Sequence, residues 1–64
     1  MMANTRNVIK ILVQIREWFA GDKDIVSVED VVLQAASSGL AGKWSNEDLI
    51  SAVRMLNRER GYDV

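Results

Sequence analysis

The sequence contains no cysteine, no histidine and no proline. The absence of cysteine excludes disulfide frameworks and thiol nucleophiles, and without cysteine or histidine there are no zinc-finger spacings. The absence of histidine also removes the imidazole that most often acts as a general base near neutral pH. Because proline breaks helices more strongly than any other residue, its absence permits uninterrupted helices.

The chain is short and close to electrically neutral. Its 64 residues predict one domain, residues 1–64, with a single small core. No run approaches 18 apolar residues, so we expect no membrane insertion and an intracellular location. Eight basic and nine acidic side chains give a net charge of −1. This balance disfavours an autonomous nucleic-acid binder, because such proteins usually carry a clear basic excess.

Apolar residues at helical spacing predict a first helix over residues 5–20. Asn4 or Thr5 is suited to cap its start, and Gly21 to end it. Ile9 and Val13 lie one turn apart and fall outside the main apolar stripe. The stripe that we expect to face the core contains Val8, Ile11, Leu12, Ile15, Trp18 and Phe19.

A second helix is predicted over residues 28–38. Ser27 fits an N-cap with Asp30 three residues later, which is the spacing of a capping box. Gly39 fits the left-handed position that closes a helix, with Leu40 folding back. The expected core side contains Val28, Val31, Val32 and Ala35.

A third helix is predicted over residues 46–60. Ser45 and Asp48 repeat the cap spacing, and Trp44 precedes Leu49 at the spacing of a hydrophobic staple. Gly61 is suited to close this helix. Its inward residues are expected to be Leu49, Ala52, Val53 and Leu56.

The runs over residues 28–32 and 46–57 resemble winged-helix subdomains of the ESCRT-II membrane-sorting complex. They are similarly close to the carboxy-terminal domains of minichromosome-maintenance helicases. The resemblance implies a mainly α, three-helix bundle of the helix-turn-helix or winged-helix-like type. We expect at most a minimal two-stranded pairing of residues 24–26 with 62–64, and no complete wing. The connection over residues 40–43 exceeds the usual helix-turn-helix turn, which weakens the analogy with DNA docking.

Four acidic residues come closest to a catalytic or metal-binding constellation: Glu29, Asp30, Glu47 and Asp48. All four lie in the first turns of predicted helices, where negative charge is stabilised by the helix dipole and side-chain oxygens can cap free amides. We therefore interpret them as helix-start residues. We expect no enzyme, no metal, no cofactor and no small-molecule substrate.

The leading functional prediction is a non-catalytic protein-interaction or assembly module that binds a protein partner or self-associates as a homo-oligomer. It is based on apolar residues that one small core does not need, namely Ile9, Val13, Leu33, Ile50 and Met55. The predicted protein-binding residues are Ile9, Val13, Trp44 and Ile50. For Trp44 the alternative is a purely structural role as the staple before Leu49.

The alternative function is a DNA-binding regulator, acting as a dimer, that places the third helix in the major groove. Arginine and asparagine can read base edges there, and lysine or arginine can contact phosphate. The candidate nucleic-acid-binding residues are Lys43, Ser51, Arg54, Asn57, Arg58 and Arg60. The competing interpretation is an ordinary solvated helix face.

Overall fold

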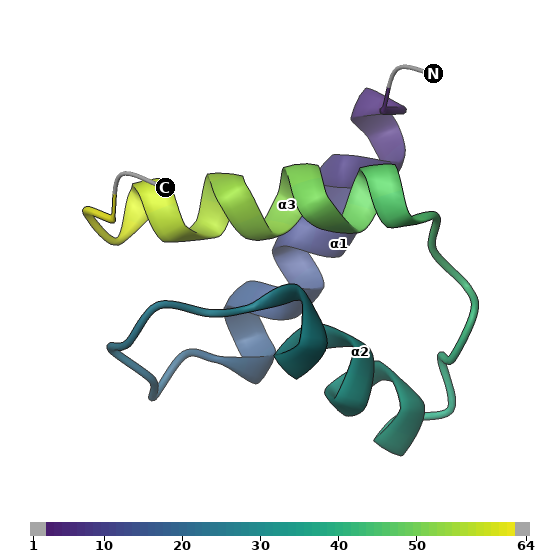
Figure 1. Ribbon diagram of the computed structural model, residues 1–64, viewed down its shortest axis with the longest axis horizontal. Coiled ribbons are helices and arrows are strands. Elements are labelled where there is room, and N and C mark those ends of the chain that lie inside the picture. Colours follow the sequence, from purple (N-terminus) through teal and green to yellow (C-terminus); the bar gives the residue numbers. More distant parts are fainter. Residues whose placement is uncertain (1–2, 63–64) are drawn as a thin grey trace.

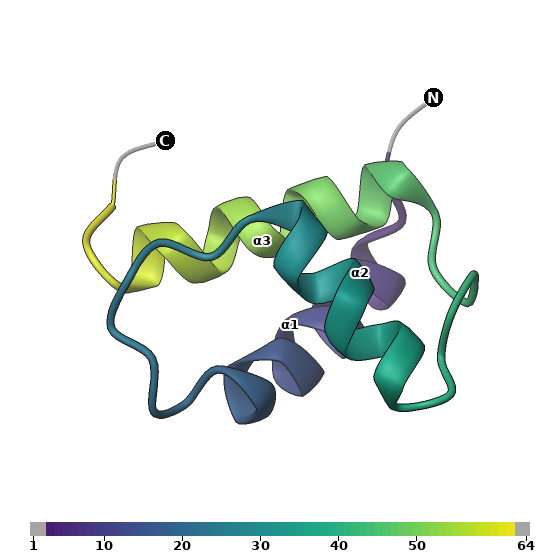
Figure 2. The same ribbon diagram turned by 60° about the horizontal axis from the view of Figure 1, so that its bottom comes forward.

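The structure, a computed structural model, describes residues 3–62. It contains α1 (Thr5–Trp18), α2 (Val28–Ser37) and α3 (Asn46–Glu59), and the described residues include no strand. Figure 1 shows α1 crossing behind α3, and α2 lying beside the carboxy-terminal half of α1. The turned view in Figure 2 brings α2 in front of α1. The prediction of a mainly α, three-helix bundle is confirmed, with each helix ending slightly earlier than expected.

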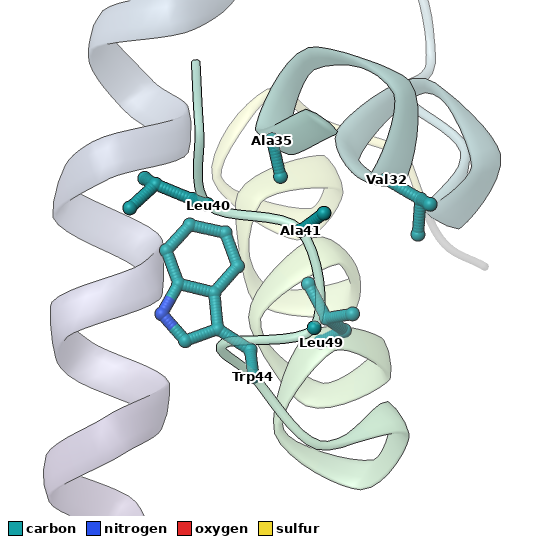
Figure 3. A pocket seen from close by; sticks show the side chains of 7 residues that line it. Val32, Ala35, Leu40, Ala41, Trp44 and Leu49 are labelled. Carbon is teal, nitrogen blue, oxygen red and sulfur yellow. The ribbon is translucent and has the colours of Figure 1, made fainter. Parts of the chain in front are cut away.

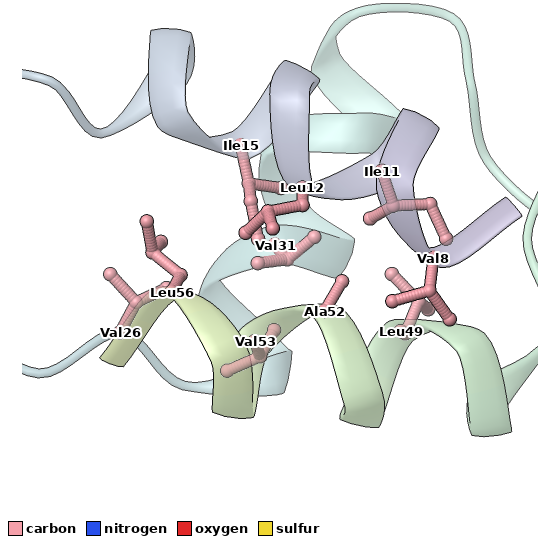
Figure 4. Close-up of a cluster of buried hydrophobic side chains, with 10 residues drawn as sticks. All are labelled: Val8, Ile11, Leu12, Ile15, Val26, Val31, Leu49, Ala52, Val53 and Leu56. Atoms are coloured by element: carbon pink, nitrogen blue, oxygen red, sulfur yellow. The ribbon is translucent and has the colours of Figure 1, made fainter. Parts of the chain in front are cut away.

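The core lies chiefly between α1 and α3, and α2 closes it from one side. Figure 4 shows side chains of α1 and α3 pointing toward one another, with Val31 of α2 between them. Ile11, Ile15 and Val31 are fully buried. Each such side chain contributes about 1.5 to 3 kcal/mol relative to exposure. The complete buried cluster is Val8, Ile11, Leu12, Ile15, Val26, Val31, Leu49, Ala52, Val53 and Leu56.

The predicted core is confirmed along α3 and over most of α1. Trp18 and Phe19 are only half-buried and pack against the edge of the cluster. On α2, Val31 and Ala35 are buried, but the expectation that Val32 faces inward is wrong because 47% of it is exposed. The helix is short and packs mainly against α3, so its buried stripe is narrower than its apolar sequence indicates.

Both serine-led helix starts form as predicted, but only one is a complete capping box. The Ser27 hydroxyl accepts a bond from the Asp30 amide, and the Asp30 carboxylate accepts one from the Ser27 amide. The Ser45 hydroxyl likewise accepts a bond from the Asp48 amide, at 3.3 Å. The Asp48 carboxylate, however, binds a different helix, so its role extends beyond capping α3.

Glycines end α2 and α3 in the predicted left-handed conformation. Gly39 has φ +76° and Gly61 has φ +92°. After α2, the Leu40 amide donates to the Ala35 carbonyl at 2.8 Å, and after α3 the Tyr62 amide donates to the Asn57 carbonyl at 2.9 Å. These are the reverse bonds of a Schellman ending, and they satisfy carbonyls that the helix leaves unpaired.

Side chains at the end of α3 hold the connection between α1 and α2. The Asn57 amide group donates to the Val26 carbonyl at 2.8 Å, and its oxygen accepts from the Val26 amide at 2.9 Å. The Arg60 guanidinium donates to the Phe19 carbonyl, and the Tyr62 hydroxyl donates to the Lys23 carbonyl at 2.6 Å. A side-chain amide therefore pairs with the backbone in the way that a neighbouring strand would.

The described residues agree with the expectation of at most a minimal strand pairing between residues 24–26 and 62–64. Residues 24–26 and 62 are not in strands, and residues 63–64 lie outside the described part of the chain. The Asn57 side chain provides the acceptor and the donor that the backbone amide and carbonyl of Val26 would otherwise find on a neighbouring strand. The resemblance to winged-helix domains stays a prediction that depends on helix order.

Polar contacts also join α1 to α3 at both ends of the two helices. The buried Asp48 carboxylate accepts bonds from the Asn4 amide at 2.8 Å and from the Asn7 side chain at 3.4 Å. At the other end, the Arg16 guanidinium forms a two-pronged ion pair with Glu59. The hydrogen bond from the backbone amide of Asn4 is the largest cause of the lowered pKa of Asp48. The hydrogen bond from the Arg16 side chain is the largest cause of the lowered pKa of Glu59.

Replacing Asn57 with alanine should lower the free energy of unfolding by roughly 2 to 4 kcal/mol, because the buried Val26 amide and carbonyl would both lose their partner. Urea denaturation followed by circular dichroism measures this loss. Arg54→Ala, at an exposed position of the same helix, is the control and should change stability by less than about 0.5 kcal/mol. Equal effects of the two substitutions would contradict the role given to Asn57.

The stability of the chain should fall on acidification, in part through Asp48. Because the folded-state pKa of Asp48 lies below its unfolded value, its contribution is present above about pH 4 and is lost as the pH falls through the folded pKa. Urea midpoints between neutral pH and pH 2 measure this, with Asp48→Asn expected to have a shallower acid decline. Glu47→Gln, at the exposed neighbouring position, is the control and should keep the acid decline of the native chain. An equally steep decline in Asp48→Asn would disprove the contribution given to Asp48.

Candidate functional site

The outward side of α2 carries a continuous apolar surface. Val32 and Leu33 are 47% and 68% exposed, and Val28 is half-buried beside them. These residues and Glu29 line a shallow open hollow along the helix. We call Val28, Glu29, Val32 and Leu33 the α2 face. A helix surface with three apolar side chains and one carboxylate can bind another apolar helix with a basic residue at its edge.

A second, smaller hollow adjoins the α2 face and shares Val32 with it. Figure 3 shows the Trp44 ring between α1 and the connection that carries Leu40 and Ala41, with Ala35 above it and Leu49 to its right. The Trp44 ring also lies 5.8 Å, centroid to centroid, from the ring of Trp18, in a tilted arrangement. Trp44 therefore lines this hollow and also packs against the core.

A separate apolar ridge runs along the outer side of α1. Ile9 and Val13 are 51% and 50% exposed and lie one turn apart. Helical geometry places Arg6 and Lys10 next to them, and both are exposed. We call Arg6, Ile9, Lys10 and Val13 the α1 ridge. Its apolar residues are thus bordered by two basic side chains, with the exposed carboxylate of Glu17 one turn beyond Val13, whereas those of the α2 face are bordered by a carboxylate alone.

The structure does not gather the predicted protein-binding residues into one patch. Ile9 and Val13 lie together on α1, Trp44 lines the smaller hollow, and Ile50 is exposed on α3. Neither hollow is lined by Ile9, Val13 or Ile50. Leu33, which the sequence analysis names only among the apolar residues not needed for the core, lines the hollow of the α2 face. The sequence analysis did not place Val32 on a binding surface, because it lies four residues after Val28 and three before Ala35, which is the spacing expected of a core residue.

The predicted nucleic-acid-binding residues fall into two groups. Lys43, Arg54 and Arg58 are exposed, and the two arginines lie one turn apart on α3. Asn57 must be removed from this set, because only 2% of it is exposed and its amide is bound to Val26. Arg60 and half-buried Ser51 are less available, since the Arg60 guanidinium already holds the Phe19 carbonyl. The helix therefore presents fewer groups to a groove than its sequence indicates.

Within residues 3–62, no group of three or more potential ligands is placed to hold a metal ion. In the same part of the chain, no helix is long and apolar enough to cross a membrane. No family model, curated protein or solved structure matches the chain. The two surfaces are therefore interpreted from their own chemistry.

The neighbouring valines of α2 allow a matched test of which side of this helix faces outward. Val31→Ala should cost about 2 kcal/mol of unfolding free energy because it leaves a cavity in the core. Val32→Ala should cost less than about 0.5 kcal/mol, since its side chain is already half in water. Both are measured by urea denaturation in dilute solution. A larger loss for Val32→Ala than for Val31→Ala would reverse the orientation of α2.

Proposed function

We propose that this chain is a non-catalytic protein-interaction module whose principal contact surface is the α2 face. One observation carries the proposal: Val32 and Leu33 are exposed side by side along a hollow that continues past Val32 toward Trp44. Contiguous exposed apolar surface is costly for a small protein unless a partner covers it.

The partner chemistry follows from the shape and charge of this surface. The hollow runs along a helix and is shallow, which suits the apolar side of another helix better than a small molecule that must be enclosed. Glu29 at its edge favours a partner with a basic residue beside the apolar ones. The net charge of −1 and the internal role of Asn57 support protein rather than DNA as the partner.

A display library of amphipathic helical peptides, selected against the immobilised chain, tests this proposal. We expect selected peptides to carry apolar residues three or four apart with lysine or arginine beside them. Their affinity should fall at least about tenfold on Val32→Asp or Leu33→Asp, because a carboxylate would be buried against apolar groups.

Met55→Asp is the matched control, since Met55 is similarly exposed but lies on α3. It should bind the selected peptides as the native chain does. Circular dichroism checks that all three variants keep their helices. The proposal fails if no peptide is selected, or if peptides bind the two α2 variants as tightly as they bind the native chain.

A further inference from the structure

We propose that a second copy of this chain occupies the α2 face by placing its α1 ridge there. This inference rests on the proposed function and identifies the partner of the α2 face as a second copy of the chain. The chain itself carries the kind of helix that the α2 face fits, with Ile9 and Val13 exposed one turn apart and Lys10 beside them. The contact would be head to tail, because the two surfaces differ.

Charge complementarity is the main argument for this occupant. The helix α1 carries three basic side chains and one acidic one, Glu17, whereas α2 carries two acidic side chains and no basic one. Arg16 is already paired with Glu59, which leaves Arg6 and Lys10 for the ridge. Within residues 3–62 neither of these two forms an ion pair, and Glu29 forms none either.

The same copy cannot satisfy both surfaces. The α1 residues that face the core are Val8, Ile11, Leu12 and Ile15, so the ridge on the other side of that helix points away from the molecule. The α2 face also points outward, since Val31 and Ala35 occupy the inner side of α2. Each copy thus offers one basic-edged ridge and one acidic-edged face to its neighbours.

The available area sets the strength of this contact. A standard interface removes roughly 800 Å² from each partner, which is about one sixth of the 4579 Å² of accessible surface of this chain. The ridge and the face each occupy part of one short helix, so the contact falls below that standard. Association should therefore be weak and should increase with concentration. A head-to-tail contact leaves a free surface at each end, and it closes only if the geometry forms a ring.

Sedimentation velocity of the purified chain from micromolar to millimolar concentration is the first measurement. We expect the average mass to rise with concentration and the rise to weaken at high salt, because exposed charges are screened. Two single charge reversals then assign the surfaces. Lys10→Glu places a negative ridge against a negative face, and Glu29→Lys places a positive face against a positive ridge. Each variant alone should associate about tenfold more weakly.

Mixing the two variants is the decisive arm. The negative ridge of Lys10→Glu then meets the positive face of Glu29→Lys, so association should return toward that of the native chain. Arg58→Glu reverses an exposed charge elsewhere, on α3, and should associate as the native chain does. Circular dichroism in dilute solution confirms that each variant is folded.

The inference is overturned if the native chain stays monomeric throughout, if either reversal leaves association unchanged, or if the mixture associates no better than its components. These results leave the proposed function standing when helical peptides still bind the α2 face. Failure of both the peptide selection and the self-association would reject the α2 face as an interaction surface altogether.

Discussion

The placement of α2 depends on the two hydrogen bonds between the Asn57 side chain and the backbone of Val26. Val26 immediately precedes the N-cap Ser27, so holding Val26 against α3 fixes where α2 begins and how it is rotated. That rotation buries Val31 and Ala35 and turns Val32 and Leu33 outward. Both bonds are buried, where little water competes for the same groups and their loss is correspondingly costly.

The small size of the chain explains why an apolar surface is left over. A bundle of this length can surround only one thin core, and the contact between α1 and α3 supplies most of it. The ten residues of α2 bury only Val31 and Ala35, and no fourth element within residues 3–62 covers their outer neighbours. The exposed valine and leucine are therefore a consequence of the fold, and a partner helix is what would bury them.

Local chemistry made the helices predictable from the sequence. The serine caps, the closing glycines and the periodic apolar residues of α1 and α3 act within a few positions, so their structural consequences can be read without knowing the tertiary arrangement. The candidate site was predicted only in part. Ile9 and Val13 are exposed together as expected, but Val32 was placed in the core and Leu33 was not placed in any site.

The features that escaped prediction depend on how the helices cross. Asn57 looks like a surface residue from its spacing, and only the approach of Val26 to α3 makes it a buried partner of the backbone. Asp48 looks like a simple cap residue until the start of α1 is placed against it. In each case a polar side chain takes its role from a segment more than 30 positions away in the sequence.

The outward orientation of α2 is tested most directly by methyl relaxation in the presence of a soluble paramagnetic probe, recorded in dilute solution. The structure predicts strong enhancement for the methyl groups of Val32 and Leu33 and little for those of Val31 and Ala35. Protection of Val32 to the level of Val31 in the monomer would contradict the account.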